Sequence, residues 1–85
     1  MKDEDIISRM RELAKGSSPF ELALALSELR GGRLTAPAFV MFFFRSFHIP
    51  LPVLYDACLV APIERPGNEQ ELDSLLDPFL SSRRR

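Results

Sequence analysis

The order of apolar and polar residues predicts α-helix at five places along the chain. In each place apolar residues recur every three or four positions, which matches the 3.6-residue turn of a helix. No window alternates between apolar and polar residues for long enough to predict a strand, and no Asn-Gly or Asp-Gly hairpin signal occurs. The pattern therefore predicts an all-α protein, a compact single-domain bundle of about five short helices.

Start and stop signals bound the first two predicted helices. The first begins at the acidic residues 3–5, which suit the positive end of a helix dipole, and runs to about Lys15 before Gly16. The second begins at residues 18–21, where Ser-Pro-Phe-Glu combines a serine cap, a proline in the first turn and the glutamate of a capping box. The paired glycines 31–32 end it.

Three further helices are predicted in the rest of the chain. Thr35 caps the third, which continues through Phe47, and the fourth runs from Pro52 to about residue 61. Asn68 precedes the fifth, which Pro78 ends or kinks. We expect one helical domain over residues 1–80 and a basic, disordered tail over residues 81–85.

The third and fourth predicted helices are apolar on more than one side. The helical phase assigns nine residues to their core faces: Phe39, Val40, Phe43, Phe44, Phe47, Leu54, Tyr55, Cys58 and Leu59. It leaves Met41, Phe42, Val53 and Val60 outside the core. A domain of this size buries only ~60–65% of the surface of its unfolded chain, so covering every side of both helices is difficult. The alternative is that the third helix is central and surrounded on all sides.

The apolar residues outside the core predict a surface that binds another protein. We expect Met41, Phe42, Val53 and Val60 to line it, with Arg45 orienting an acidic group at the rim. The leading hypothesis is a non-catalytic, adaptor-like interaction module whose partner is another protein or, in a homodimer, a second copy of the chain. Five or six short antiparallel helices in about this length also resemble the death-domain-like adaptor folds, and this fold-level resemblance implies the same kind of role.

Two other functions are consistent with the charges. Glu69, Asp73 and Asp77 recur every four residues without a basic partner at that spacing, which predicts either a solvated face or a docking face for a basic protein. The second reading describes an immunity or antitoxin-type inhibitor. A small DNA-associated regulator is the third candidate. A DNA-reading helix needs polar and basic side chains, whereas the helix after the glycine turn carries Phe and Met, with Arg45 as its one basic residue.

Composition and charge bear on the choice between these functions and on where the protein is expected in the cell. The 85 residues carry 11 Lys and Arg against 12 Asp and Glu, so a net charge of -1 provides no general attraction for nucleic acid or anionic membranes. The one cysteine, Cys58, excludes a disulfide within the chain and any cysteine-rich zinc site. With acidic residues where a secretory signal carries basic ones, and with apolar runs far shorter than ~20 residues, we expect a cytoplasmic protein.

The sequence predicts no enzyme and no cofactor or metal. His48 and Cys58 form the one combination that resembles a nucleophile and its base. Each has a simpler explanation, because Cys58 falls on an apolar stripe as a small hydrophobe and His48 falls at the end of a helix, where it can meet the dipole. Phosphate-binding and hydrolase motifs are absent from the sequence. We therefore expect Cys58 to be inert.

Overall fold

The computed structural model describes residues 2–64 and 66–80, and these residues form five helices and no strand. The helices are α1 (Asp3–Leu13), α2 (Pro19–Leu29), α3 (Ala36–Phe47), α4 (Leu51–Cys58) and α5 (Glu69–Leu80). The predicted all-α class is confirmed. The predicted tail at residues 81–85 lies outside the described residues.

The helix boundaries differ from the sequence prediction mainly at the ends. Helix α1 ends at Leu13, two residues early, and α4 begins at Leu51 and ends at Cys58. Pro78 lies inside the last turn of α5, which continues to Leu80.

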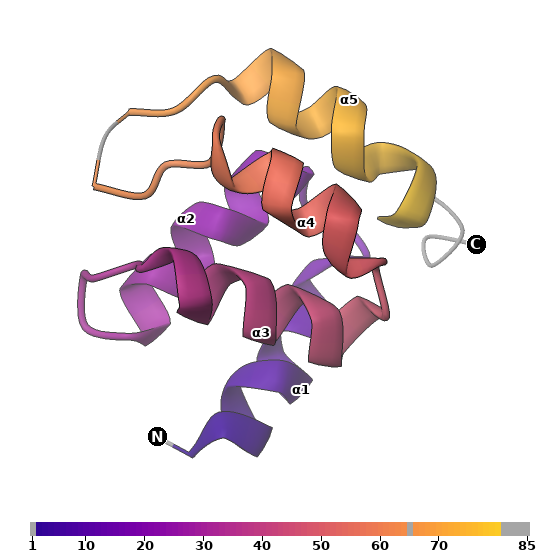
Figure 1. Cartoon of the computed structure of the whole chain (residues 1–85). Helices are drawn as coiled ribbons and strands as arrows, with labels where there is room; N and C mark the ends of the chain where they lie inside the picture. The colour runs from indigo at the N-terminus through magenta and orange to yellow at the C-terminus, as the bar shows by residue number, and fades with distance from the viewer. Residues whose placement is uncertain (1, 65, 81–85) are drawn as a thin grey trace.

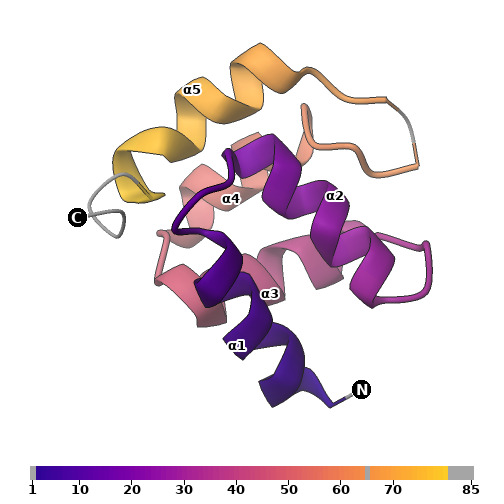
Figure 2. The ribbon, with the colours of Figure 1, turned by 180° about the vertical axis from the view of Figure 1, so that it is seen from behind.

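The helices form two layers with a fifth helix across one end. Helices α3 and α4 run side by side in opposite directions in the layer that faces the viewer in Figure 1, and α5 passes above α4. From behind, α2 and α1 form the second layer (Figure 2). Helix α1 packs on α3 and on α2, while α5 packs on α2 and on α4. Among the described residues, this order leaves one side of the α3–α4 pair without a helix over it.

Side chains from the predicted caps begin three of the helices. Ser18 Oγ accepts a hydrogen bond from the Glu21 amide at 3.2 Å, and Glu21 Oε1 accepts one from the Ser18 amide at 2.9 Å, so the capping box is confirmed. Thr35 Oγ1 accepts from the Ala38 amide at 3.3 Å, and Asn68 Oδ1 accepts from the Glu71 amide at 3.1 Å.

The end of α3 is fixed by a residue from another helix. Arg11 of α1 donates from Nε to the carbonyl oxygen of Ser46 at 3.0 Å and from Nη2 to that of Arg45 at 3.1 Å. Carbonyls in the last turn of a helix lack intrahelical partners, so a guanidinium there satisfies both. His48 then takes a left-handed conformation, with φ at 56°, and turns the chain towards α4.

The core differs from the predicted one in the rotation of α3. Its buried residues are Ala38, Phe39, Phe42, Phe43, Ser46 and Phe47. Placing Phe42 outside the core is therefore wrong, since its exposed fraction is 0%, and placing Phe44 inside is also wrong, since it is 40% exposed. The reason lies in the neighbours of α3. Helix α1 packs on this helix, and the guanidinium of Arg30 lies 5.4 Å from the centre of the Phe42 ring.

Helix α4 is rotated in the same way. Leu54 and Ala57 are its buried residues, while Tyr55 and Leu59, which the sequence assigned to the core, are 59% and 71% exposed. The small Ala57 side chain suits close approach between helices, whereas the sequence pattern gave more weight to large residues. Val53 and Val60, which the sequence placed outside the core, are partly buried and pack against it, as Val40 and Cys58 of the predicted core faces also do.

Candidate protein interface

The exposed large apolar residues are concentrated on one side of the molecule. Among the described residues there are six, and five of them lie on α3, on α4 or at the C-cap of α4: Met41, Phe44, Leu51, Tyr55 and Leu59. We call these five residues the α3–α4 face. The sixth, Leu24, lies on α2. Met41 is the one member of this face that was also predicted from the sequence to line a partner surface.

A shallow apolar groove runs between the two helices of this face. Its volume is about 460 Å³, and it is lined by Ala36, Pro37, Val40, Met41, Tyr55 and Cys58. Met41 and Tyr55 belong both to the groove and to the α3–α4 face, so the two features form one surface.

The antiparallel order of α3 and α4 makes the face continuous. Because the chain turns back at residues 48–50, the end of α3 lies level with the beginning of α4 (Figure 1). Phe44 in the last turn of α3 and Leu51 at the beginning of α4 therefore lie at the same end of the pair, while Met41 and Tyr55 line the groove between the helices. Along α4, Leu51, Tyr55 and Leu59 follow one another at four-residue spacing, which places them on one side of the helix.

Charge is scarce in this part of the chain. Of the 11 basic and 12 acidic residues, only Arg45 and Asp56 lie within residues 36–60. Depletion of charged residues around exposed aromatic and aliphatic side chains is typical of the central part of a protein interface. Arg45 Nη1 lies 3.9 Å from Asp3 Oδ2, and both side chains remain about half exposed. Arg45, which follows Phe44 of the face in sequence, thus keeps a half-exposed guanidinium, and its predicted role at the rim stays a prediction.

Cys58 and His48 lie at opposite ends of α3. Cys58 Sγ makes a weak contact of 4.0 Å with the carbonyl oxygen of Ala36, the first residue of α3, whereas His48 is the C-cap of the same 12-residue helix. A helix of that length spans ~18 Å, so the two side chains are too far apart for proton transfer. Partial burial raises the pKa of the Cys58 thiol, which lowers the thiolate fraction at neutral pH.

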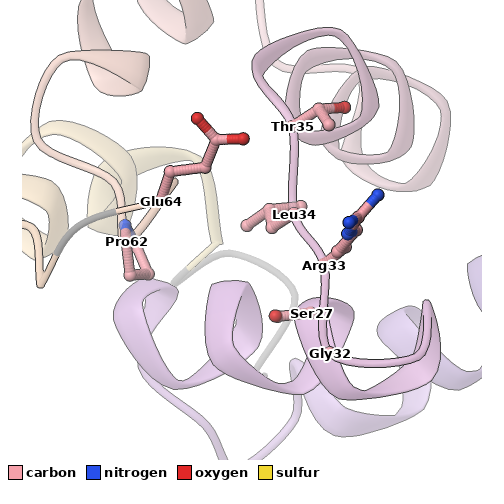
Figure 3. Close-up of a pocket in the computed structure, with 7 residues that line it drawn as sticks. All are labelled: Ser27, Gly32, Arg33, Leu34, Thr35, Pro62 and Glu64. Atoms are coloured by element: carbon pink, nitrogen blue, oxygen red, sulfur yellow. The ribbon is translucent and has the colours of Figure 1, made fainter.

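A second concavity, polar in character, lies where the α2–α3 connection meets the α4–α5 connection. It has a volume of about 520 Å³ and is lined by Ser27, Gly32, Arg33, Leu34, Thr35, Pro62 and Glu64. Figure 3 shows the Glu64 side chain reaching towards the segment that carries Leu34 and Thr35, while Arg33 extends on the other side of that segment. Thr35 Oγ1 is already engaged as the cap of α3. The cavity thus presents two exposed side chains of opposite charge, Arg33 and Glu64.

The predicted acidic face on α5 is partly used by the fold itself. Asp73 Oδ1 accepts a hydrogen bond from the Phe20 amide at 2.9 Å, which satisfies a free amide in the first turn of α2. Asp77 is partly buried and Glu69 is exposed. Of the three predicted residues, Glu69 is therefore the one whose side chain is exposed to solvent.

Comparisons with known proteins assign no family to this chain. A scan against protein-family models, a search of curated proteins and a search of solved structures each found no significant match. Within residues 2–64 and 66–80, no cluster of three or more His, Cys, Asp or Glu side chains is arranged to hold a metal ion. None of the helices in the same residues has the length and apolar character that a membrane span requires.

Proposed function

We propose that this protein is a non-catalytic interaction module that binds another protein through the α3–α4 face. The proposal is carried by one observation: of the six exposed large apolar residues in the described part of the chain, five lie together on one charge-poor surface. Single exposed apolar residues are ordinary on a soluble protein, whereas a contiguous group marks an interaction site.

Tyr55 and Leu59 are the expected centres of binding. They are the most exposed of the group, so a partner that covers them removes the largest apolar area from water. Complete burial of one such side chain contributes ~1.5–3 kcal/mol, which is the range of an interface hot spot. The tyrosine hydroxyl adds a polar group that can reach water or a partner at the edge of the contact.

The side chains that line the groove favour binding over catalysis. Its side chains are aliphatic, aromatic or thioether, and its one thiol has a raised pKa. We place the module in the cytoplasm, because a single free cysteine suits a reducing compartment.

The test is capture of partners from native cells with three purified baits: the wild-type chain, Tyr55→Lys and Leu24→Lys. Leu24 is the matched control, since it is an exposed leucine on another helix. We expect Tyr55→Lys to lose a co-purifying protein that the wild type and Leu24→Lys both retain. The proposal is contradicted if all three baits capture the same proteins in the same amounts.

A further inference from the structure

We propose that the occupant of the α3–α4 face is a second copy of this chain, with α4 packed antiparallel against its counterpart about a two-fold axis near Tyr55. This inference rests on the proposed function, because it names the partner of the same surface.

The arrangement of apolar residues along α4 is self-complementary. In a two-fold dimer each contact occurs twice, so the surface must match its own rotated copy. The exposed stripe reads Leu51, Tyr55, Leu59, with equal spacing on either side of the tyrosine. In an antiparallel pair centred on Tyr55, the two tyrosines meet near the axis and each Leu51 lies over the Leu59 of the other copy. The stripe is about 12 Å long, at 1.5 Å per residue.

The area of the face fits the requirement of a stable dimer. If a large apolar side chain offers ~200 Å², the exposed fractions of the five residues leave roughly 500 Å² of apolar surface per chain. A standard interface buries ~800 Å² on each partner, of which about 60–65% is apolar. The face therefore supplies about the apolar area that one side of such an interface contains. That interface covers roughly one sixth of the 5112 Å² surface of the chain.

The charges of the region do not oppose this contact. Asp56 is the one acidic or basic residue of α4, and around the helix it lies ~100° from Tyr55 and ~60° from Leu59, beside the stripe rather than on it. Arg45 lies on α3 at the edge of the face. The two Asp56 side chains lie near the axis of such a dimer, but each is exposed beside the stripe, where water screens their repulsion.

Sedimentation equilibrium over a wide concentration range tests the dimer. We expect the wild-type mass to rise from 9.7 kDa towards twice that value with concentration, as it does for Leu24→Lys. Tyr55→Lys should remain monomeric while its circular dichroism and thermal melt stay close to those of the wild type. A wild-type chain that is monomeric at every concentration up to about 1 mM, where even a Kd in the weak micromolar range is saturated, overturns the inference.

Disulfide trapping tests the antiparallel register, with Cys58→Ser as the background so that no other thiol is present. Tyr55→Cys should cross-link to itself, because the residue lies near the axis. Leu51→Cys should cross-link slowly alone and rapidly when mixed with Leu59→Cys. Faster cross-linking of Leu51→Cys with itself than with Leu59→Cys indicates a parallel pair and contradicts the proposal.

The failure of this inference differs from the failure of the proposed function. A monomeric chain that still loses a captured protein on Tyr55→Lys substitution has the proposed function with a different partner. A monomeric chain whose captured proteins are insensitive to Tyr55→Lys has neither.

Discussion

Phe42 and Phe44 are two positions apart on α3 and lie in opposite environments. Phe42 is fully buried and lies beneath the guanidinium of Arg30, while Phe44 is 40% exposed on the α3–α4 face. Two positions along a helix correspond to a rotation of about 200°, so these two phenylalanine side chains point to nearly opposite sides of α3. The first contributes to folding, and the second is available to a partner.

Substitution of each phenylalanine by alanine should separate these tasks. Phe42→Ala should lower the free energy of unfolding by ~3–5 kcal/mol, because it leaves a cavity in the core. Phe44→Ala should lower it by about 1 kcal/mol or less. Urea denaturation of both variants measures the difference, and equal losses would show that the rotation of α3 is not as described.

Cys58 should react slowly in the native protein. Its partial burial raises the pKa of the thiol above the ordinary value, so less thiolate is present at a given pH. Labelling of the folded chain should rise with pH and reach half of its maximum rate at a higher pH than labelling of the urea-unfolded chain. Stopped-time alkylation followed by mass spectrometry measures both profiles. Rapid native labelling at neutral pH would contradict the expected inertness.

Among the elements, the beginning of α2 is held by two carboxylates from different parts of the chain. Glu21 closes the local capping box with Ser18, and Asp73 of α5 accepts from the Phe20 amide. The negative charges also suit the positive end of the helix dipole. The contact from Asp73 connects α5 to α2 as well as satisfying an amide.

Asp73→Ala should therefore destabilise the fold while Glu69→Ala should not. Loss of a capping acceptor lowers the free energy of unfolding by ~0.5–2 kcal/mol, and Ser18→Ala should give a loss in the same range. Glu69→Ala, at an exposed position one turn earlier on α5, should change it by less than about 0.5 kcal/mol. Thermal denaturation of the three variants checks this order. Equal losses of stability for Asp73→Ala and Glu69→Ala would contradict a capping role for Asp73 and indicate that it is a solvated acidic residue like Glu69.

Helix starts could be predicted from the sequence and helix rotations could not. A capping box such as that of Ser18 and Glu21 depends on residues three positions apart, so its signal is local. Which side of α3 turns inwards depends on α1, α2 and α4, and α3 is apolar on most sides. For the same reason the sequence assigned Tyr55 and Leu59 to the core, whereas the structure exposes them beside Met41 on the two helices where a partner surface was predicted. The available signal was the scarcity of charge over residues 36–60, where Arg45 and Asp56 are the only basic and acidic residues.

At the scale of the whole molecule, the connection between α4 and α5 is closed by a close backbone contact at Gly67. Its φ is 73°, and a Cβ atom there would lie 2.7 Å from the carbonyl oxygen of Val60 and 2.9 Å from backbone atoms of Ala61 and Pro62. The next amide, that of Asn68, donates to the same Val60 oxygen at 2.7 Å. The loop thus folds back on the end of α4 and sets where α5 begins.

Gly67→Ala should accordingly loosen the docking of α5. The left-handed backbone alone costs an alanine ~1–2 kcal/mol, and the contact with backbone atoms adds to that loss. Gly16→Ala is the control, because no atom lies within 4 Å of its Cβ position and its effect should be neutral or slightly stabilising. Urea denaturation compares the two variants. A Gly67→Ala protein as stable as Gly16→Ala would show that the loop opens at little cost.

The apolar character of α3 on both its buried and its exposed side bears on how the chain finds one native state. A helix rotated to bury Met41 and Phe44 would also cover much apolar surface, so hydrophobic burial alone distinguishes poorly between the two packings. We expect polar contacts to favour the observed rotation, in which Arg11 donates to the last carbonyls of α3 and Arg30 lies over the Phe42 ring. Replacing both arginines with methionine should keep the helix content by circular dichroism while side-chain NMR signals broaden across several competing packings. That result would show that a single packing of α3 depends on Arg11 and Arg30. Sharp side-chain NMR signals from the double variant would contradict it.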